Sequence, residues 1–197
     1  NLRRLRRYVA PYLEEASHKV RVYFRKVMDD MEVMDSEAAR LGRLVNEVLD
    51  LSKLEAGKLT LNWAEVDLKS VVDGAVAATS VLWREKSLLV EVLAPSELPS
   101  GYGDADRLSQ VVVNLLSNAI KFTERGTIQI KVEASDEWLE ITVIDPGRGI
   151  PPDQLAHVFQ RFSQVERPMD GPGGGTGLGL PICRQLVKLH GGEIRVS

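Results

Sequence analysis

The apolar residues of this 197-residue chain change their spacing at Gly57, and this change divides the sequence into two parts. From Val27 to Val48, apolar side chains recur in steps of three and four, the pattern of a helix that packs against other helices. Glycine commonly follows the last turn of a helix, so Gly57 is expected to end this segment. The spacing predicts a helical segment over residues 1–57 and a second domain over residues 58–197.

The second part alternates short strand patterns with amphipathic helix patterns. Asp67 is a suitable N-cap for the first of its helices. Strands are expected at 59–63, 88–93, 127–133 and 138–144, helices at about 68–86, 106–122 and 178–189, and the start of a further strand at 193–197. This order predicts an α+β fold, a two-layer sandwich with helices on one face of a mixed sheet.

Composition excludes several classes of protein. The formal net charge of −3 provides no strong field for nucleic acid or for an anionic membrane, although four arginines lie within the first seven residues. No apolar run approaches the length of a membrane span. We therefore expect a cytoplasmic fragment without nucleic-acid or membrane contacts. Whether a longer parent protein has a membrane anchor stays an open question. The single cysteine, Cys183, lies in an apolar segment and is expected in the core.

The helix expected at 106–122 carries polar residues where its apolar face does not need them. Asn114, Asn118 and Lys121 are three and four residues apart, so they share one helix face. Amide oxygens beside a lysine suit a hydrated Mg²⁺ and phosphate groups. The alternative is a solvated helix face, which two asparagines inside a helix make less favourable.

Three further clusters follow in the chain. Asp145, Gly147 and Gly149 come directly after an apolar strand, where a carboxylate can accept a hydrogen bond from an amine and glycines allow close approach of a flat ligand. Phe159, Arg161 and Phe162 fit a short helix with two core aromatics and an arginine within reach of a phosphate. A simple turn and an ordinary core contact are the alternatives.

The last cluster is a glycine-rich run, Gly173 to Leu180, that opens an apolar helix. Freed backbone amides at a helix N-terminus form an anion site, and a flexible linker would not continue directly into such a helix. The P-loop pattern is absent from the sequence, and a dinucleotide fingerprint starting at Gly147 fails at Pro152.

Taken in this order, the four clusters resemble the N, G1, F and G2 boxes of the ATP-binding domain of sensor histidine kinases, within the wider group of GHKL ATPases. The segment Leu49 to Gly57 also resembles the end of the dimerisation hairpin of these kinases. The resemblance covers about Met31 to Ser197 and implies a helical hairpin, which forms a dimeric four-helix bundle, followed by a GHKL-type sandwich.

The resemblance also implies roles for single residues. Asn118, with Asn114, would bind Mg²⁺, Lys121 and Arg161 would stabilise the phosphates of ATP, and Asp145 would bind the adenine amine. The segment from Gln164 to Gly173 would be a mobile lid. The pocket and the triphosphate site would be completed by the following residues: Gly147, Gly149, Phe159, Phe162, Gly175, Thr176, Gly177, Leu178 and Gly179.

Position 114 separates branches of the GHKL group. Hydrolytic members place a glutamate, the general base for water, four residues before the Mg²⁺-binding asparagine. The residue here is Asn114, and an amide cannot take a proton from water. The resemblance therefore favours a kinase over a hydrolase.

The acceptor histidine of the family normally begins a His-Glu-Leu-Arg-Thr-Pro-like motif, which this sequence lacks. His18 follows Ala-Ser as such an acceptor often does, but Lys19, Val20 and Arg21 come next. The span from His18 to Gly57 is also short for two hairpin arms. We hypothesise that a segment is missing directly after His18, and that His18 is the acceptor; the alternative is an ordinary surface histidine.

The leading interpretation is a homodimeric histidine kinase that uses Mg-ATP, phosphorylates a histidine and passes the phosphoryl group to an aspartate of a response-regulator receiver domain. The alternative is a catalytically silent, nucleotide-binding dimeric scaffold, motivated by the absent acceptor motif. A GHKL ATPase is the third interpretation, which Asn114 disfavours.

Overall fold

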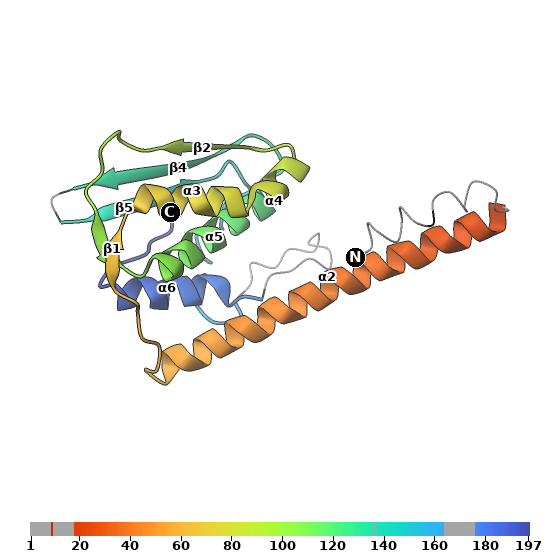
Figure 1. Cartoon of the computed structure of the whole chain (residues 1–197), viewed down its shortest axis with the longest axis horizontal. Coiled ribbons are helices and arrows are strands. Elements are labelled where there is room, and N and C mark those ends of the chain that lie inside the picture. Colours follow the sequence, from red (N-terminus) through yellow and green to blue (C-terminus); the bar gives the residue numbers. More distant parts are fainter. Residues whose placement is uncertain (1–8, 10–17, 136, 164–175) are drawn as a thin grey trace. The chain divides into compact units, whose positions relative to one another are not determined.

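The computed structural model of the chain describes residues 9, 18–135, 137–163 and 176–197, and it comprises two units, Asn1–Leu49 and Asp50–Ser197. Helix α2 (His18–Glu55) extends through the described part of the first unit and into the start of the second (Figure 1). The unit boundary thus lies within α2, whereas the sequence places it after Gly57. Part of the reason is that Leu51 and Leu54 already pack into the core of the second unit.

Helix α2 is one continuous helix from His18 to Glu55. No break follows His18, because Lys19 continues the same helix, and the hypothesis of a segment missing from the sequence at this point stays a prediction. The expected hairpin turn is likewise not found within His18–Glu55. Gly57 does end the helix as predicted: its φ is +61°, and the N–H of Lys58 donates to the carbonyl of Lys53.

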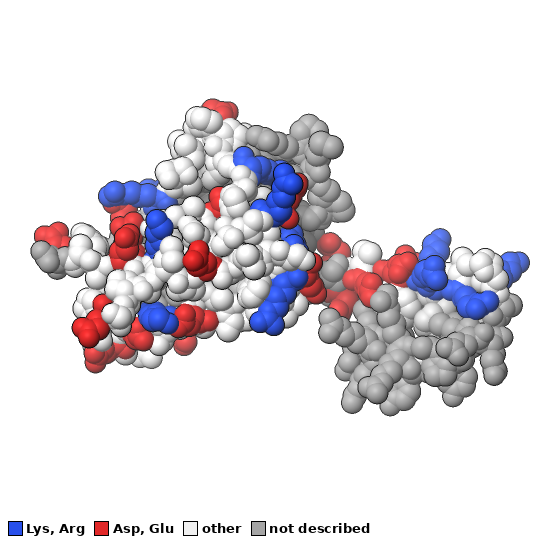
Figure 2. All heavy atoms as spheres, turned by 90° about the horizontal axis from the view of Figure 1, so that it is seen from above, with Lys and Arg blue, Asp and Glu red and all other residues white. Residues whose placement is uncertain are grey.

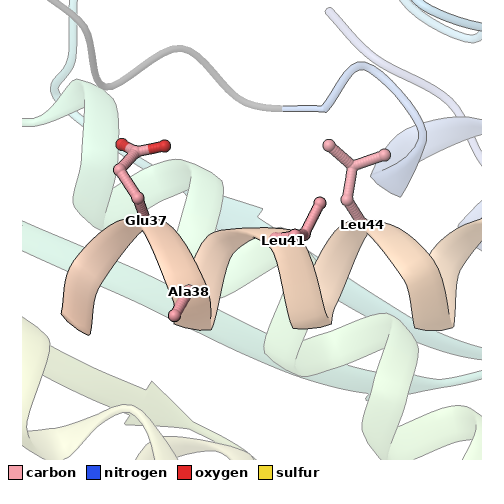
Figure 3. A pocket seen from close by; sticks show the side chains of 4 residues that line it. All are labelled: Glu37, Ala38, Leu41 and Leu44. Atoms are coloured by element: carbon pink, nitrogen blue, oxygen red, sulfur yellow. The ribbon is translucent and has the colours of Figure 1, made fainter. Parts of the chain in front are cut away.

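The predicted apolar seam of α2 is exposed in the structure. Figure 3 shows Glu37, Leu41 and Leu44 projecting from one side of the helix, where they line a hollow together with Ala38. Leu41 is 63% exposed. The other exposed apolar members of the seam are Val27, Met31, Met34, Val45 and Val48. The described residues therefore leave an apolar stripe on α2 available for another helix.

The second unit contains two small sheets. Strand β1 (Ala64–Val66) pairs antiparallel with β3 (Gly101–Gly103), with Glu65 opposite Tyr102. Strand β4 (Thr127–Ala134) is the centre of the larger sheet, parallel to β2 (Leu89–Leu93) and antiparallel to β5 (Leu139–Ile144). The larger sheet is therefore mixed, as predicted.

Helices lie on one side of the larger sheet, as Figure 1 shows for the second unit. They are α3 (Leu68–Ala78), α4 (Ser80–Glu85), α5 (Ala105–Phe122) and α6 (Gly179–Leu189). Val112 and Leu116 of α5 are buried with Ile128 and Ile130 of β4 in the larger core. A second core joins Val111 of α5 to α6 and to the end of α2, and it buries Cys183 as expected. The two-layer prediction is confirmed for this unit.

Local interactions change four of the predicted elements. Residues 59–63 form no strand, because the pairing with β3 begins only at Ala64. Residues 193–197 also form no strand, and β3 lies in a segment expected to be a loop. The helix expected to continue to about residue 86 is divided at Thr79. The buried Thr79 hydroxyl donates to the carbonyl of Ala75 at 2.9 Å, which competes with the helical hydrogen bonds.

The two charge signs are mixed over the surface. On the face shown in Figure 2, basic and acidic side chains lie interspersed over the second unit. This distribution agrees with the formal net charge of −3. No helix among the described residues is both long and apolar enough to cross a membrane.

Lys86 binds the C-terminal end of α5. Its ammonium group donates to the carbonyl oxygens of Ile120, Lys121 and Thr123 at 2.7, 2.8 and 3.2 Å. The last carbonyls of a helix have no partner within the helix, and a cation there also complements the helix dipole. Lys86 thus fixes the end of α5 from a residue more than thirty positions away in the sequence.

Asp104 joins three segments at the other end of α5. Its carboxylate accepts hydrogen bonds from the backbone N–H of Arg107 at 3.1 Å and of Asn62 at 2.9 Å. The N–H of Asp104 donates to Nε2 of His190, whose Nδ1 contacts the carbonyl of Leu186 at 2.8 Å. Burial acts to raise the pKa of Asp104, but these hydrogen bonds and the charge of Arg107 outweigh it, so the pKa lies below its usual range.

We expect Lys86→Met to lower the free energy of unfolding by about 2 kcal/mol, because it removes charge-assisted hydrogen bonds to three carbonyls. Urea denaturation followed by circular dichroism measures the change. Lys69→Met is the matched control, since Lys69 forms only an exposed ion pair with Asp73, and its effect should be much smaller. Equal effects of the two substitutions would contradict the assigned role of Lys86.

We expect Asp104→Asn to destabilise the protein at neutral pH and to do so less as the pH falls. A carboxylate with a lowered pKa in the folded state stabilises that state above its unfolded pKa of about 3.9, and the contribution is lost as the pH falls through the folded pKa. Denaturation at pH 7 and at pH 3 gives the two differences. Asp67→Asn, at the exposed N-cap of α3, is the control with a smaller difference at pH 7. A difference between wild type and Asp104→Asn that does not depend on pH would contradict the role of the charge.

Candidate functional site

The polar face of α5 is the centre of the site. Asn114 and Asn118 are half-buried, and Lys121 is exposed at the end of the helix. The side chains of Asn114 and Asn118 are in contact, with Nδ2 of Asn118 3.5 Å from Oδ1 of Asn114. Because α5 buries its opposite face in both cores, this polar face is held in a fixed orientation.

The loop after β5 packs against the end of α5. The backbone N–H of Gly147 donates to Oδ1 of Asp145 at 2.9 Å, and the carboxylate has a second oxygen with which to accept a hydrogen bond. A Cβ at position 147 would lie 2.4 Å from that Oδ1 and 2.8 Å from the carbonyl oxygen of Phe122. The absence of a side chain at Gly147 therefore lets Asp145 lie beside α5. Gly149 has a φ of +66° and open space around it.

Phe122 and Arg148 are two residues of this region that the sequence analysis did not identify. The Lys121 ammonium and the Arg148 guanidinium each lie 4.8 Å from the centre of the Phe122 ring. Phe122 is 37% exposed, so an aromatic surface flanked by cations lies where α5 meets the loop after β5. One signal in the sequence could have identified Phe122. It is an aromatic residue directly after Lys121 that continues the polar face of the helix.

The turn segment before residue 163 is joined to the beginning of α6. Phe162 has a φ of +59°, and its N–H donates to the carbonyl of Gly177 at 2.9 Å. Gly177 has a φ of +72°, and a Cβ there would lie 2.7 Å from Cα of Phe162. Thr176 accepts a hydrogen bond from the N–H of Leu178, which is fully buried. The described residues on either side of the expected lid are therefore in contact, Phe162 before it and Gly177 after it.

The expected short helix around Phe159 is instead a series of turns, linked by hydrogen bonds such as the one from the N–H of His157 to the carbonyl of Gln154. Phe159 is half-buried, with the Arg184 guanidinium 5.6 Å from its ring. Phe162 is 66% exposed, so its expected place in the core is wrong. Arg161 is exposed.

The first turn of α6 contacts the polar face of α5 directly. A Cβ at Gly179 would lie 2.5 Å from Oδ1 and 2.7 Å from Nδ2 of Asn114. The four clusters predicted from the sequence are thus in contact with one another: Asn114 with Gly179, Phe122 with Gly147, and Phe162 with Gly177.

His18 is the exposed first residue of α2 and belongs to the first unit. Gly175 and the expected lid from Gln164 to Gly173 lie outside the described residues. His190 is the C-cap residue of α6.

The residues present fit a magnesium nucleotide. Gly147, Gly177 and Gly179 let the clusters pack closely, because groups of Phe122, Phe162 and Asn114 lie where a side chain would be. The N-terminus of α6 provides the amides of Gly179 and Leu180 and a positive dipole end for an anion. Amide oxygens on α5 are suitable ligands for Mg²⁺, and Asp145 is a suitable acceptor for an amine.

Comparison with known proteins agrees with this geometry. The family model described as histidine kinase-, DNA gyrase B- and HSP90-like ATPase matches residues 103–197. Hybrid signal transduction histidine kinase D of Dictyostelium discoideum is 39% identical over 176 residues, which are 86% of this chain and 11% of that protein. Histidine-protein kinase BarA of Escherichia coli K12 is 38% identical over 84% of this chain and 19% of its own length.

The crystal structure of full-length ShkA in complex with AMPPNP is a structural relative. It superposes with a TM-score of 0.68 at 29% identity, over 90% of this chain and 35% of that one. The chain thus spans less than a quarter of the length of the two curated relatives described above.

We expect Gly177→Ala to destabilise the second unit more than Gly191→Ala does. Both glycines have a positive φ, +72° and +78°, at which an alanine costs roughly 1–2 kcal/mol. Only position 177 adds a steric overlap, with the backbone of Phe162, because Gly191 has open space around it. Chemical denaturation of the two variants gives the comparison. Equal losses would show that the contact between residues 177 and 162 contributes nothing to stability.

Proposed function

Because the chain belongs to the sensor histidine kinases by its histidine kinase-, DNA gyrase B- and HSP90-like ATPase region, we propose that it binds Mg-ATP and transfers the γ-phosphoryl group to a histidine. The observation that carries the proposal is the contact of Asn114 with Gly179 and of Phe122 with Gly147, which brings the polar face of α5, Asp145 and the α6 N-terminus into one region. In this proposal the polar face of α5 binds the cation, Asp145 binds the adenine and the α6 N-terminus binds the phosphates.

Each group has a role that follows from its chemistry. Asn118 provides an oxygen for Mg²⁺, which neutralises phosphate charge, and Asp145 accepts a hydrogen bond from the adenine amine. The α6 N-terminus and the glycines before it hold the phosphates, with Lys121 and Arg161 as further cations. Phosphoryl transfer depends mostly on such positioning and charge.

The proposed acceptor is His18. It is exposed on α2, so its imidazole is accessible to a donor. An imidazole nitrogen attacks the γ-phosphorus, the bond from this phosphorus to the β–γ bridging oxygen breaks, and ADP leaves with that electron pair. The imidazole gives up its N–H proton. An aspartate of a receiver domain then takes the phosphoryl group.

The proposed assembly is a homodimer in the cytoplasm. The exposed apolar stripe of α2, which includes Leu41 and Val45, supports it, because a solvated helix seldom keeps so many apolar side chains exposed on one face. Two such helices can bury their stripes against each other, as helices do in four-helix bundles.

Incubation with γ-labelled ATP and Mg²⁺ tests the proposal. We expect an acid-labile, base-stable label that His18→Gln removes and that the exposed control His157→Gln leaves intact. Asn118→Ala should remove the label as well, by weakening the binding of the magnesium nucleotide. Nucleotide binding without any label would instead favour a silent scaffold, and rapid release of inorganic phosphate would favour an ATPase.

A further inference from the structure

The side-chain amide of Asn114 lies between Gly179 of α6 and Asn118 of α5. The ideal Cβ position of Gly179 is 2.5 Å from Oδ1, 2.7 Å from Nδ2 and 3.0 Å from Cγ of Asn114, so the whole amide group rests against this glycine. Such distances are far shorter than a van der Waals contact. The amide can therefore occupy its position only because residue 179 has no side chain.

The same amide contacts Asn118. Nδ2 of Asn118 donates to Oδ1 of Asn114 at 3.5 Å, and both side chains are half-buried. An asparagine amide has one oxygen and one nitrogen. When the nitrogen of Asn118 points toward Asn114, its oxygen is directed away from Asn114, and an amide oxygen is a suitable ligand for Mg²⁺. A rotated Asn118 would offer Mg²⁺ an N–H₂ group, which cannot serve as a ligand.

From these contacts we propose that Asn114 is a positioning residue, which fixes the amide of Asn118 with its oxygen toward Mg²⁺, and that Gly179 provides the space that Asn114 requires. In this proposal Asn114 acts through Asn118, from which its oxygen accepts the hydrogen bond, and is not itself a ligand of the cation. The proposal rests on the proposed binding of magnesium nucleotides, and it replaces the expectation that both asparagines are metal ligands.

The surroundings of Gly179 determine which group must move if a side chain is added there. Leu178, Ile182 and Leu186 anchor α6 in the second core, and each is at most 1% exposed. Moving α6 away would open this core, whereas the Asn114 side chain can rotate about its own bonds. An alanine at position 179 therefore displaces the Asn114 amide and releases Asn118.

The experiment measures how much Mg²⁺ strengthens ATP binding. Calorimetric titration of the 197-residue chain with ATP, once with Mg²⁺ and once with EDTA, gives the ratio of the two affinities. We expect Asn114→Ala and Gly179→Ala each to lower this ratio about tenfold, the lower end of the loss found when a residue that supports a metal ligand is removed. For Asn114→Ala the affinity in EDTA should stay within about twofold, since the binding of the base and phosphates does not use this hydrogen bond. Gly179→Ala is judged by the ratio alone, because Gly179 begins the helix whose N-terminus holds the phosphates. Gly74→Ala is the matched control, because Gly74 is also in a helix and has open space around it.

Double variants separate positioning from direct ligation. Gly179→Ala should have no further effect on the ratio in the Asn114→Ala background, because the alanine at 114 leaves room for a methyl group. In an Asn118→Asp background, Asn114→Ala should also have no effect, since both carboxylate oxygens are acceptors and need no orientation. If Asn114 were itself a ligand, its removal would lower the ratio in the Asn118→Asp background as well as in the wild-type chain.

The outcomes are distinct. An unchanged ratio in Asn114→Ala, or a further loss of the ratio in the Asn114→Ala,Asn118→Asp double variant, overturns the positioning role while leaving nucleotide binding intact. A wild-type chain that binds no ATP, or binds it without regard to Mg²⁺, overturns the proposed function and this inference with it. Thermal unfolding of each variant identifies any that do not fold. If Gly179→Ala does not fold, the result for Asn114→Ala alone decides the question.

Discussion

The burial of two sides of helix α5 is the constraint on which the second unit depends. Val112 and Leu116 face the larger sheet, and Val111 faces α6, so the helix is fixed against both rotation and translation. Asp104 holds its first turn and Lys86 its last carbonyls. The remaining face, with Asn114 and Asn118, is therefore positioned by apolar packing on the other sides of the helix. A site that requires two amides in a defined orientation benefits from a helix that cannot turn.

The residues that make α5 amphipathic also made it predictable. Its apolar period and the spacing of Asn114, Asn118 and Lys121 are local properties, and the structure keeps them on opposite faces. The division of the preceding helix at Thr79 depends instead on a buried hydroxyl that bonds to Ala75, and burial is not a local property. Short strands such as β1 and β3 are set by their partner rather than by their own period, and for this reason the sequence placed β1 too early and missed β3.

The contacts among the clusters are the part of the site that only the structure provides. Glycines at 147, 177 and 179 indicate close approach in the sequence, but not what approaches them. The structure identifies the neighbours as Phe122, Phe162 and Asn114. The pair of cations around Phe122 was missed for the same reason, since Arg148 and Phe122 are far apart in the chain and meet only through the packing at Gly147.

The position of Asn114 also bears on the choice between transfer and hydrolysis. A hydrolase needs a group that removes a proton from water, and such a group must keep a basic atom available. The amide of Asn114 is not basic, its oxygen accepts from Asn118, and Gly179 closes one side of it. A water molecule near this amide would have no base beside it, and on the side of Gly179 it would have no space. The phosphoryl group then needs a nucleophile that is effective without such a base, and the imidazole of a histidine meets this requirement. The packing that orients Asn118 therefore also supports transfer to a side chain over loss to solvent.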